Sequence, residues 1–144
     1  MSTINSQLKQ TLRQHGYSVT RPRLIVFDLL DGHAPQTMHQ LIQLAGDEID
    51  RASLYRVISL FEEIGVAQRV YAGWKYTLEL TDLFSHHHHH LTCLGCGTQI
   101  AVVEDSAIES LILRVAQQHQ MVPVRHQLEI QGYCLHCQKS VAGV

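Results

Sequence analysis

Residues 86–96, HHHHHLTCLGC, place five consecutive histidines directly before a Cys-x-x-Cys pair, and this stretch decides the kind of fold to expect. A second pair, Cys134 and Cys137, follows near the end of the chain. Four thiolates in two such pairs are the typical ligands of a structural zinc ion, because soft sulfur and a tetrahedral shell suit Zn²⁺. We therefore predict one structural zinc site, formed by Cys93, Cys96, Cys134 and Cys137.

The histidines are available as ligands for other metal ions, because four cysteines already complete one zinc shell. Successive side chains of a strand point to opposite faces of the sheet. A strand through residues 88–93 therefore places His88 and His90 on one face, with His87 and His89 on the other. The chain is predicted to hold one closed metal site and at least one site that is open to exchange.

Length and composition limit the function classes. The chain has 144 residues, which is room for one domain or two small ones, and 45% of them are hydrophobic, enough for a core. Two disulfides in an exported protein are an alternative use of the cysteines, but residues 1–10 have no apolar signal region. The sequence contains no run of about 18 apolar residues, the length that would predict a membrane span. We expect a cytoplasmic, reduced protein with no membrane partner.

Charge is unevenly distributed along the chain. The formal net charge is −2, but residues 1–75 carry eight of the eleven Lys and Arg and seven acidic residues, a net +1. Residues 76–144 carry three basic and six acidic residues, a net −3. A slightly basic half joined to an acidic, His-rich half is typical of a DNA-binding domain attached to a metal-binding module.

The first half has the pattern of a winged helix-turn-helix. Apolar residues at helical spacing predict four helices, with Thr20 and Asp50 as N-caps of the second and fourth. The helices are expected over 4–15, 21–30, 37–45 and 51–64, followed by strands over 66–70 and 75–80. The third helix would support the fourth, which would be the recognition helix, and the two strands would form the wing.

The second half predicts strands over 88–93, 98–103 and 125–131 around a helix over 105–119. The buried face of that helix is expected to consist of Ile108, Leu111, Ile112, Val115 and Ala116. Such a module leaves strand edges that can pair across a two-fold axis, which favours a dimer. The predicted fold is α+β, with a winged-helix DNA-binding domain (1–80), a hinge (81–85) and a metal-binding α/β dimerisation domain (86–144).

Residues 86–97 resemble the signature of the ferric uptake regulator (Fur) superfamily. Other marks occur in the family's order: TRPR at 20–23, RASLYR at 51–56, YTLEL at 76–80, and His126 eight residues before Cys134. The resemblance extends from about Leu8 to Cys137, nearly the whole chain. It implies a homodimeric transcriptional repressor of metal-uptake genes, whose corepressor metal favours binding to a palindromic, A/T-rich double-stranded operator.

The resemblance also implies two further metal sites. The regulatory site would span the hinge and consist of His33, Glu79, His88 and His90. The second site of the dimerisation domain would consist of His87, His89, Glu109 and His126.

The identity of the regulatory metal stays open between Zn²⁺ and Fe²⁺, with Mn²⁺ as a third candidate. Iron-type members of the family carry a further carboxylate where this chain has Ala101. The remaining set of three nitrogens and one carboxylate suits tetrahedral Zn²⁺, whereas Fe²⁺ and Mn²⁺ take more oxygen ligands. We therefore favour Zn²⁺ modestly.

DNA contacts are expected from the recognition helix and the wing. Tyr55 could pack on thymine methyl groups, and Arg56 could bind a phosphate or a guanine edge. Further expected contacts are Arg51, Arg23, Arg69 and Lys75.

Three other functions remain as alternatives. A peroxide sensor on the same scaffold would oxidise a ligating histidine, and a His-rich metal buffer would not bind DNA. A metallohydrolase is disfavoured because the chain has neither an H-E-x-x-H signature nor a separate general base. We expect no enzymatic activity.

Overall fold

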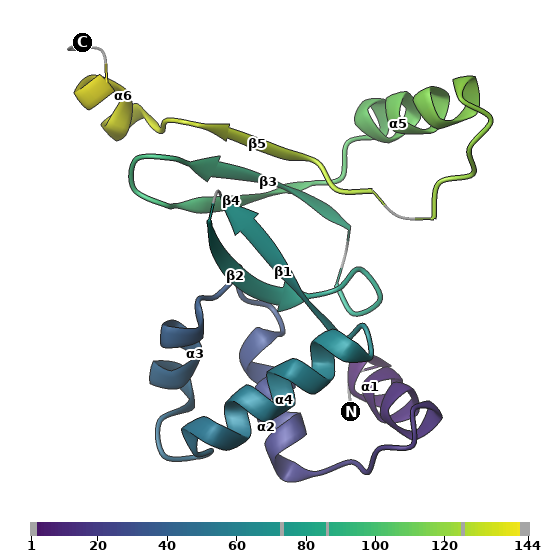
Figure 1. Ribbon diagram of the computed structural model, residues 1–144, viewed down its shortest axis with the longest axis vertical. Coiled ribbons are helices and arrows are strands. Elements are labelled where there is room, and N and C mark those ends of the chain that lie inside the picture. The colour runs from purple at the N-terminus through teal and green to yellow at the C-terminus, as the bar shows by residue number, and fades with distance from the viewer. Residues whose placement is uncertain (1–2, 73, 86, 125, 142–144) are drawn as a thin grey trace. The chain divides into compact units, whose positions relative to one another are not determined.

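Residues 3–72, 74–85, 87–124 and 126–141 are described by the structure, a computed structural model. The chain divides into two units, residues 1–85 and residues 86–144. Figure 1 shows that the first unit holds most of the helices, whereas the second is built around a sheet. The predicted α+β class is confirmed.

The first unit consists of helices α1 (Thr3–Gln14), α2 (Arg21–Leu30), α3 (Met38–Ala45) and α4 (Arg51–Glu63), followed by strands β1 (Ala67–Ala72) and β2 (Lys75–Leu80). The strands form an antiparallel hairpin whose register extends from the pair Ala67 and Leu80 to the pair Ala72 and Lys75. An isolated bridge between Gln36 and Leu78 ties the segment before α3 to β2. This order of elements is that of a winged helix-turn-helix.

Local side-chain contacts fix where the two helices of the helix-turn-helix begin. Thr37 and Gln40 form a capping box at the start of α3. At the start of α4, the Asp50 carboxylate accepts a hydrogen bond from the backbone N–H of Ser53 at 2.9 Å, and hydrogen bonds from Ser53 lower the pKa of Asp50. The expectation for Thr20 is only half right, because Thr20 occupies the N-cap position of α2 but its side chain makes no capping hydrogen bond.

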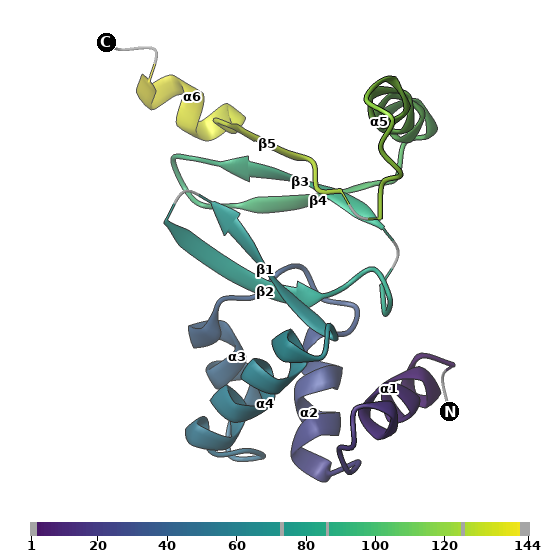
Figure 2. The same ribbon diagram turned by 45° about the vertical axis from the view of Figure 1, so that its right-hand side comes forward.

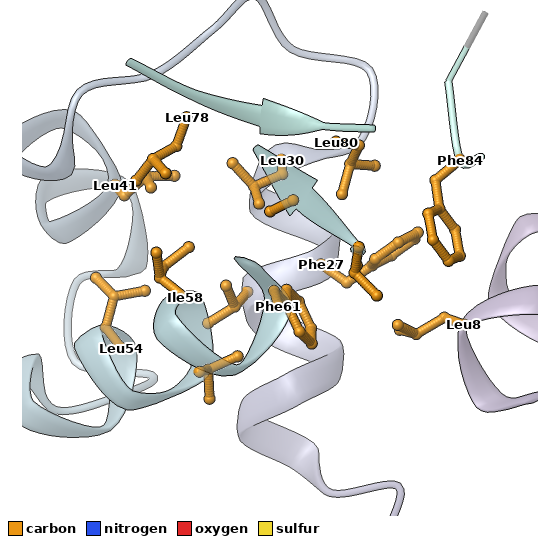
Figure 3. Close-up of a cluster of buried hydrophobic side chains, with 14 of the residues drawn as sticks. Leu8, Phe27, Leu30, Leu41, Leu54, Ile58, Phe61, Leu78, Leu80 and Phe84 are labelled. Carbon is orange, nitrogen blue, oxygen red and sulfur yellow. The ribbon is translucent and has the colours of Figure 1, made fainter. Parts of the chain in front are cut away.

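The hydrophobic core lies among the helices and the hairpin of the first unit. Figure 3 shows Leu8, Phe27, Leu41, Phe61 and Leu80 converging from α1, α2, α3, α4 and β2. Phe84, in the segment predicted as a hinge, belongs to this unit, and its ring lies 5.5 Å from that of Phe27 in an edge-to-face arrangement. With Ala67 of β1, all six elements of this unit share one core, and this core holds the helix-turn-helix in shape.

The second unit is built on a three-stranded sheet in the order β4-β3-β5. Its elements are β3 (His88–Cys93), β4 (Gln99–Val103), α5 (Ser106–Gln118), β5 (Glu129–Gly132) and α6 (Leu135–Val141). Strand β3 pairs with β4 antiparallel and with β5 parallel.

Two element boundaries differ from the predicted ones by more than one residue, and one helix was not predicted. β1 extends to Ala72, so that Tyr71 and Ala72 pair within the hairpin instead of forming its turn. β5 begins only at Glu129, and Arg125, the first residue of the expected strand, lies outside the described residues. The helix without a predicted counterpart is α6, which begins at Leu135, inside the second cysteine pair.

The expected buried face of α5 is wrong for a single chain. None of the α5 residues is buried, and Leu111 and Val115 are each about half exposed. In both views α5 stands beyond one end of the sheet and does not cover its face (Figures 1 and 2). Among the described residues of this unit, Cys93 is the one buried apolar side chain.

None of the helices described by the structure is long and apolar enough to cross a membrane.

Two leucines of α3 test the core of the first unit. Leu41 is fully buried, whereas Leu44 on the same helix is half exposed. Leu41→Ala is expected to lower the free energy of unfolding by about 2–5 kcal/mol, because it leaves a cavity. Leu44→Ala removes the same atoms from a half-exposed position and should cost less than about 1 kcal/mol. The measurement is urea denaturation followed by far-UV circular dichroism, and equal losses for the two variants would contradict this assignment of the core.

Candidate metal centres

The four cysteines come together at one end of the sheet of the second unit. Their ligand atoms all lie within 4.8 Å of one another, and none of them forms a disulfide. Cys93 ends β3, Cys134 follows β5, and Cys137 lies in α6. The Sγ atoms of Cys96 and Cys134, one from each pair, are 3.9 Å apart. A set of four sulfurs at this separation fits a tetrahedral zinc ion.

Backbone N–H groups favour the thiolate form of Cys93. The backbone N–H of Cys134 donates to the Cys93 Sγ at 3.3 Å. Hydrogen bonds from the N–H groups of Cys134 and Cys96 lower the pKa of the Cys93 thiol to about 6. The neighbouring Cys134 thiol, by contrast, raises the pKa of Cys137 to about 12. The crowding of four sulfurs thus opposes full deprotonation, and a bound cation would relieve that opposition.

Two residues that support the cysteine cluster, Gly95 and Thr98, were not predicted from the sequence. The Thr98 side chain is hydrogen-bonded to Cys96, with its Oγ1 3.1 Å from the Sγ, and this contact lowers the pKa of Cys96. Gly95 lies so close to Cys137 that an added Cβ would be 2.8 Å from both the Cβ and the Sγ of that cysteine. A glycine between the two cysteines of a pair was the available signal for such a close approach.

A second cluster joins β3 to α5 and to the segment before β5. Its ligand atoms, also within 4.8 Å of one another, come from His87, His89, Glu109 and His126. The Nε2 of His89 lies 2.9 Å from Glu109 Oε1, and the Nε2 of His126 lies 3.3 Å from Oε2 of the same carboxylate. The Nε2 atoms of His87 and His126 are 2.9 Å apart. Three imidazole nitrogens that point at one carboxylate form a donor set that fits a divalent metal such as Zn²⁺.

The two faces of β3 carry different sets of histidines, as the alternation predicts. The rings of His88 and His90 are 4.8 Å apart, and those of His87 and His89 are 4.9 Å apart. His86, the first histidine of the run, lies outside the described residues. Glu129 of β5 pairs with His90 of β3, and its carboxylate accepts a hydrogen bond from Thr92 Oγ1 at 2.8 Å. This carboxylate was not singled out from the sequence, because only the parallel pairing of β5 brings it beside β3.

The four residues predicted for the regulatory site come from both units. His33 follows α2 and Glu79 lies in β2, both in the first unit, whereas His88 and His90 lie in the second. The Nδ1 of His33 is 2.9 Å from the carbonyl oxygen of Asp31, so Nδ1 donates and Nε2 keeps its lone pair for a metal. Glu79 Oε1 accepts a hydrogen bond from Gln68 at 2.8 Å. The joint set stays a prediction.

The residues predicted to contact DNA differ in exposure and in the hydrogen bonds that their side chains form. Arg51, Tyr55 and Arg56 are exposed on α4, opposite the buried Leu54 and Ile58.

Several of the predicted basic contacts form hydrogen bonds within the first unit. The Nε of Arg56 donates to the carbonyl oxygen of Ala52 at 3.3 Å. Arg23 donates to the carbonyl oxygen of Ser18. Arg69 forms two hydrogen bonds with Glu62, at 2.5 and 3.0 Å, which hold the pKa of Arg69 above its ordinary value. Lys75, the first residue of β2, is exposed.

Two glycines of the second unit test the cysteine cluster. Gly95→Ala would push Cys137 out of position, so we expect zinc transfer to a chelator to become about tenfold faster or more. Gly132→Ala is the matched control, because an added Cβ meets nothing within 4 Å there. The release of zinc is measured with a metallochromic indicator after addition of excess chelator. Equal release from the two variants would contradict the role of Gly95.

Comparison with known proteins agrees with this arrangement. The sequence model of the Ferric uptake regulator family matches residues 14–131. The ferric uptake regulation protein of Escherichia coli (strain K12) is 37% identical over 130 residues, which cover 85% of each chain.

Solved structures give the same result. The Vibrio cholerae ferric uptake regulator matches with a TM-score of 0.71 and 30% identity, over 88% of this chain and 98% of that one. The ferric uptake regulator of Pseudomonas aeruginosa, solved with manganese, matches with a TM-score of 0.74 and 26% identity, over 93% and 99%. The chain therefore belongs to the Ferric uptake regulator family, whose members are metal-responsive transcriptional regulators.

Proposed function

We propose that this protein is a homodimeric, metal-dependent repressor that binds operator DNA and controls genes of metal uptake. The observation that carries the proposal is the combination of two units in one chain. The first exposes Arg51, Tyr55 and Arg56 on the second helix of a helix-turn-helix. The second gathers cysteines, histidines and a glutamate into clusters that fit metal ions.

The regulatory metal is proposed to bind His33, Glu79, His88 and His90. The alternation of β3 supports this, because it turns His88 and His90 to a face of their own. The hydrogen bond of His33 to Asp31 supports it too, because that bond leaves Nε2 of His33 available. A metal held by residues of both units would restrict their relative motion. The metal would favour the DNA-binding arrangement only if it binds that arrangement more tightly than the others. The difference between these affinities sets the size of the effect.

Zn²⁺ is the first candidate for the regulatory metal, ahead of Fe²⁺ and Mn²⁺. Ala101, the partner of His90 on β4, has no ligand atom to offer. Three nitrogens and one carboxylate suit the tetrahedral shell of zinc. Fe²⁺ stays a candidate because relatives are named for ferric uptake. Mn²⁺ stays a candidate because the Pseudomonas aeruginosa regulator was solved with manganese.

The two clusters within the second unit are proposed to have different roles. Cys93, Cys96, Cys134 and Cys137 leave no open position around a zinc ion, so that site would be structural. A metal at His87, His89, Glu109 and His126 would tie α5 and the segment before β5 to β3. It would then stabilise the module without joining the two units.

Contact with DNA is proposed to centre on α4. Tyr55 is 48% exposed, so its ring can pack on thymine methyl groups in the major groove. Arg51 and Arg56 would bind phosphates or a guanine edge. The contacts of Arg23 and Arg69 with Ser18 and Glu62 would have to rearrange before these arginines could bind a phosphate.

We propose that the chain dimerises through the second unit, because the described residues of this unit bury almost no apolar side chains. Cys93 is its one buried apolar residue among those described, and large apolar side chains stay exposed on the sheet, on α5 and between them. They include Ile100, Val103, Leu111, Leu113, Val115, Met121, Val122, Val124 and Ile130. An apolar surface of this extent on a small unit is typical of an interface. A second copy of the chain would cover it.

The dimer can be tested on α5. Val115→Glu places a charge in the proposed interface and is expected to raise the dimer dissociation constant at least about tenfold. Gln117→Glu adds the same charge on the same helix, at an exposed polar position, and should leave the constant nearly unchanged. Sedimentation equilibrium measures both. A Val115→Glu protein that dimerises like the wild type would show that α5 lies outside the interface.

Metal dependence is tested by operator binding. Protein that keeps its structural zinc is titrated with Zn²⁺, Fe²⁺ or Mn²⁺ and examined by mobility shift on promoter DNA. The wild type should gain operator affinity about tenfold or more on metal binding, and His90→Ala should lose this gain. His119→Ala, an exposed position outside the clusters, serves as the control.

The outcomes of this titration separate the alternatives. Equal operator affinity of chelated and metal-loaded wild type would contradict a metal-dependent repressor. A protein that binds metal tightly but no DNA would be a metal buffer.

A further inference from the structure

The tip of the β1–β2 hairpin carries an exposed aromatic residue that nothing above uses. Trp74 stands in the turn between the two strands and is 87% exposed. It is the single tryptophan of the chain. A large aromatic ring that stays in water contributes nothing to the core, and residues of this type are enriched where proteins bind partners. Its position therefore calls for a partner that covers it.

The charge around Trp74 favours a polyanion as that partner. The Lys75 ammonium group lies 5.3 Å from the centre of the Trp74 ring, a cation–π contact that holds both side chains at the tip. The hairpin contains Arg69 and Lys75 and one acidic residue, Glu79, which pairs with Gln68 at the end of the hairpin away from the tip. Because Glu62 pairs with Arg69, the positive charge of the hairpin is concentrated on Lys75. An aromatic ring beside a cation matches the sugar-phosphate backbone of nucleic acid, which offers an apolar sugar edge beside a phosphate.

The hairpin is also in the right place for a DNA contact. It belongs to the same unit as α4, and the shared core fixes the two relative to each other. In both views the turn end of the hairpin and the N-terminal end of α4 lie towards the same side of this unit (Figures 1 and 2). A duplex that receives α4 in its major groove can therefore continue past the hairpin.

We propose that Trp74 and Lys75 form a second DNA contact at the wing tip. The indole ring packs against the deoxyribose edge of the operator backbone, and the Lys75 ammonium group binds the neighbouring phosphate. This inference rests on the proposed operator binding. It adds a contact that is independent of sequence, because sugars and phosphates carry no base information.

Two variants separate the apolar from the ionic part of this contact. Trp74→Ala is expected to lower affinity about tenfold for operator and for unrelated duplex DNA alike, with Trp74→Phe in between. The salt dependence of its binding should match that of the wild type, since no charge is lost. Lys75→Gln should reduce the slope of log affinity against log salt by about 1.

The control for Trp74 is Leu83→Ala. Leu83 is a large apolar residue of the same unit, 64% exposed, and lies outside the hairpin. Its replacement should leave DNA affinity unchanged. Fluorescence anisotropy of labelled duplexes, with metal-loaded protein of equal zinc content and equal far-UV circular dichroism, gives all these constants.

The tryptophan itself provides a second measurement. Its fluorescence reports on the wing tip alone, so operator binding should protect it from quenching by acrylamide. Wild-type affinity for Trp74→Ala, or unchanged quenching at saturating operator, would overturn the inference. So would protection that rises with protein concentration in the absence of DNA, because a second copy would then cover the ring. If the wild type itself binds no operator, the proposed function fails first; if it binds and Trp74→Ala binds equally, only the wing contact fails.

Discussion

The convergence of four cysteine sulfurs is the constraint on which the second unit depends. This unit buries a single apolar side chain among its described residues, so apolar burial alone does not hold the sheet and its two helices together. The cysteine cluster joins the end of β3, the segment between β5 and α6, and helix α6 itself. A zinc ion bound there would connect segments far apart in sequence, the usual solution for a small module without a sufficient core.

The first unit is stabilised in a different way. Its helices and hairpin share one core, and the starts of α3 and α4 are fixed by Thr37 and Asp50. It can therefore present α4 as a rigid surface with no metal of its own. The second unit exposes apolar surface and gathers ligands, features that make its structure dependent on partners. This division suits a regulator, because the core of the first unit keeps the shape that DNA recognises, while a metal bound by residues of both units would restrict their relative motion.

Strand β3 provides two ligand sets from one run of histidines. The period of two along a strand turns His87 and His89 to one face, with His88 and His90 on the other. Within the second unit, different elements approach the two faces. Glu109 from α5 and His126 from before β5 approach His87 and His89, while β5 places Glu129 beside His90. One short sequence can thus serve two metal ions, provided that the surrounding fold keeps the faces apart.

The amino-acid sequence by itself determined what depends on near neighbours. The order of helices and hairpin, the cap at Asp50, the two cysteine pairs and the alternation along residues 88–93 all follow from local spacing. So does the family, because its marks are short motifs in a fixed order. Local spacing also shows that one face of α5 is apolar.

Only the tertiary structure decided what covers each face and what approaches each ligand. The apolar face of α5 stays exposed in one chain. An amphipathic pattern shows that a helix has an apolar face, but not whether its own chain or a second chain covers that face. Helix α6, the late start of β5 and the approach of Gly95 to Cys137 depend on contacts between residues distant in sequence. The set of His87, His89, Glu109 and His126 was expected from the family resemblance, but local spacing does not explain it, since loop closure around the sheet brings its members together.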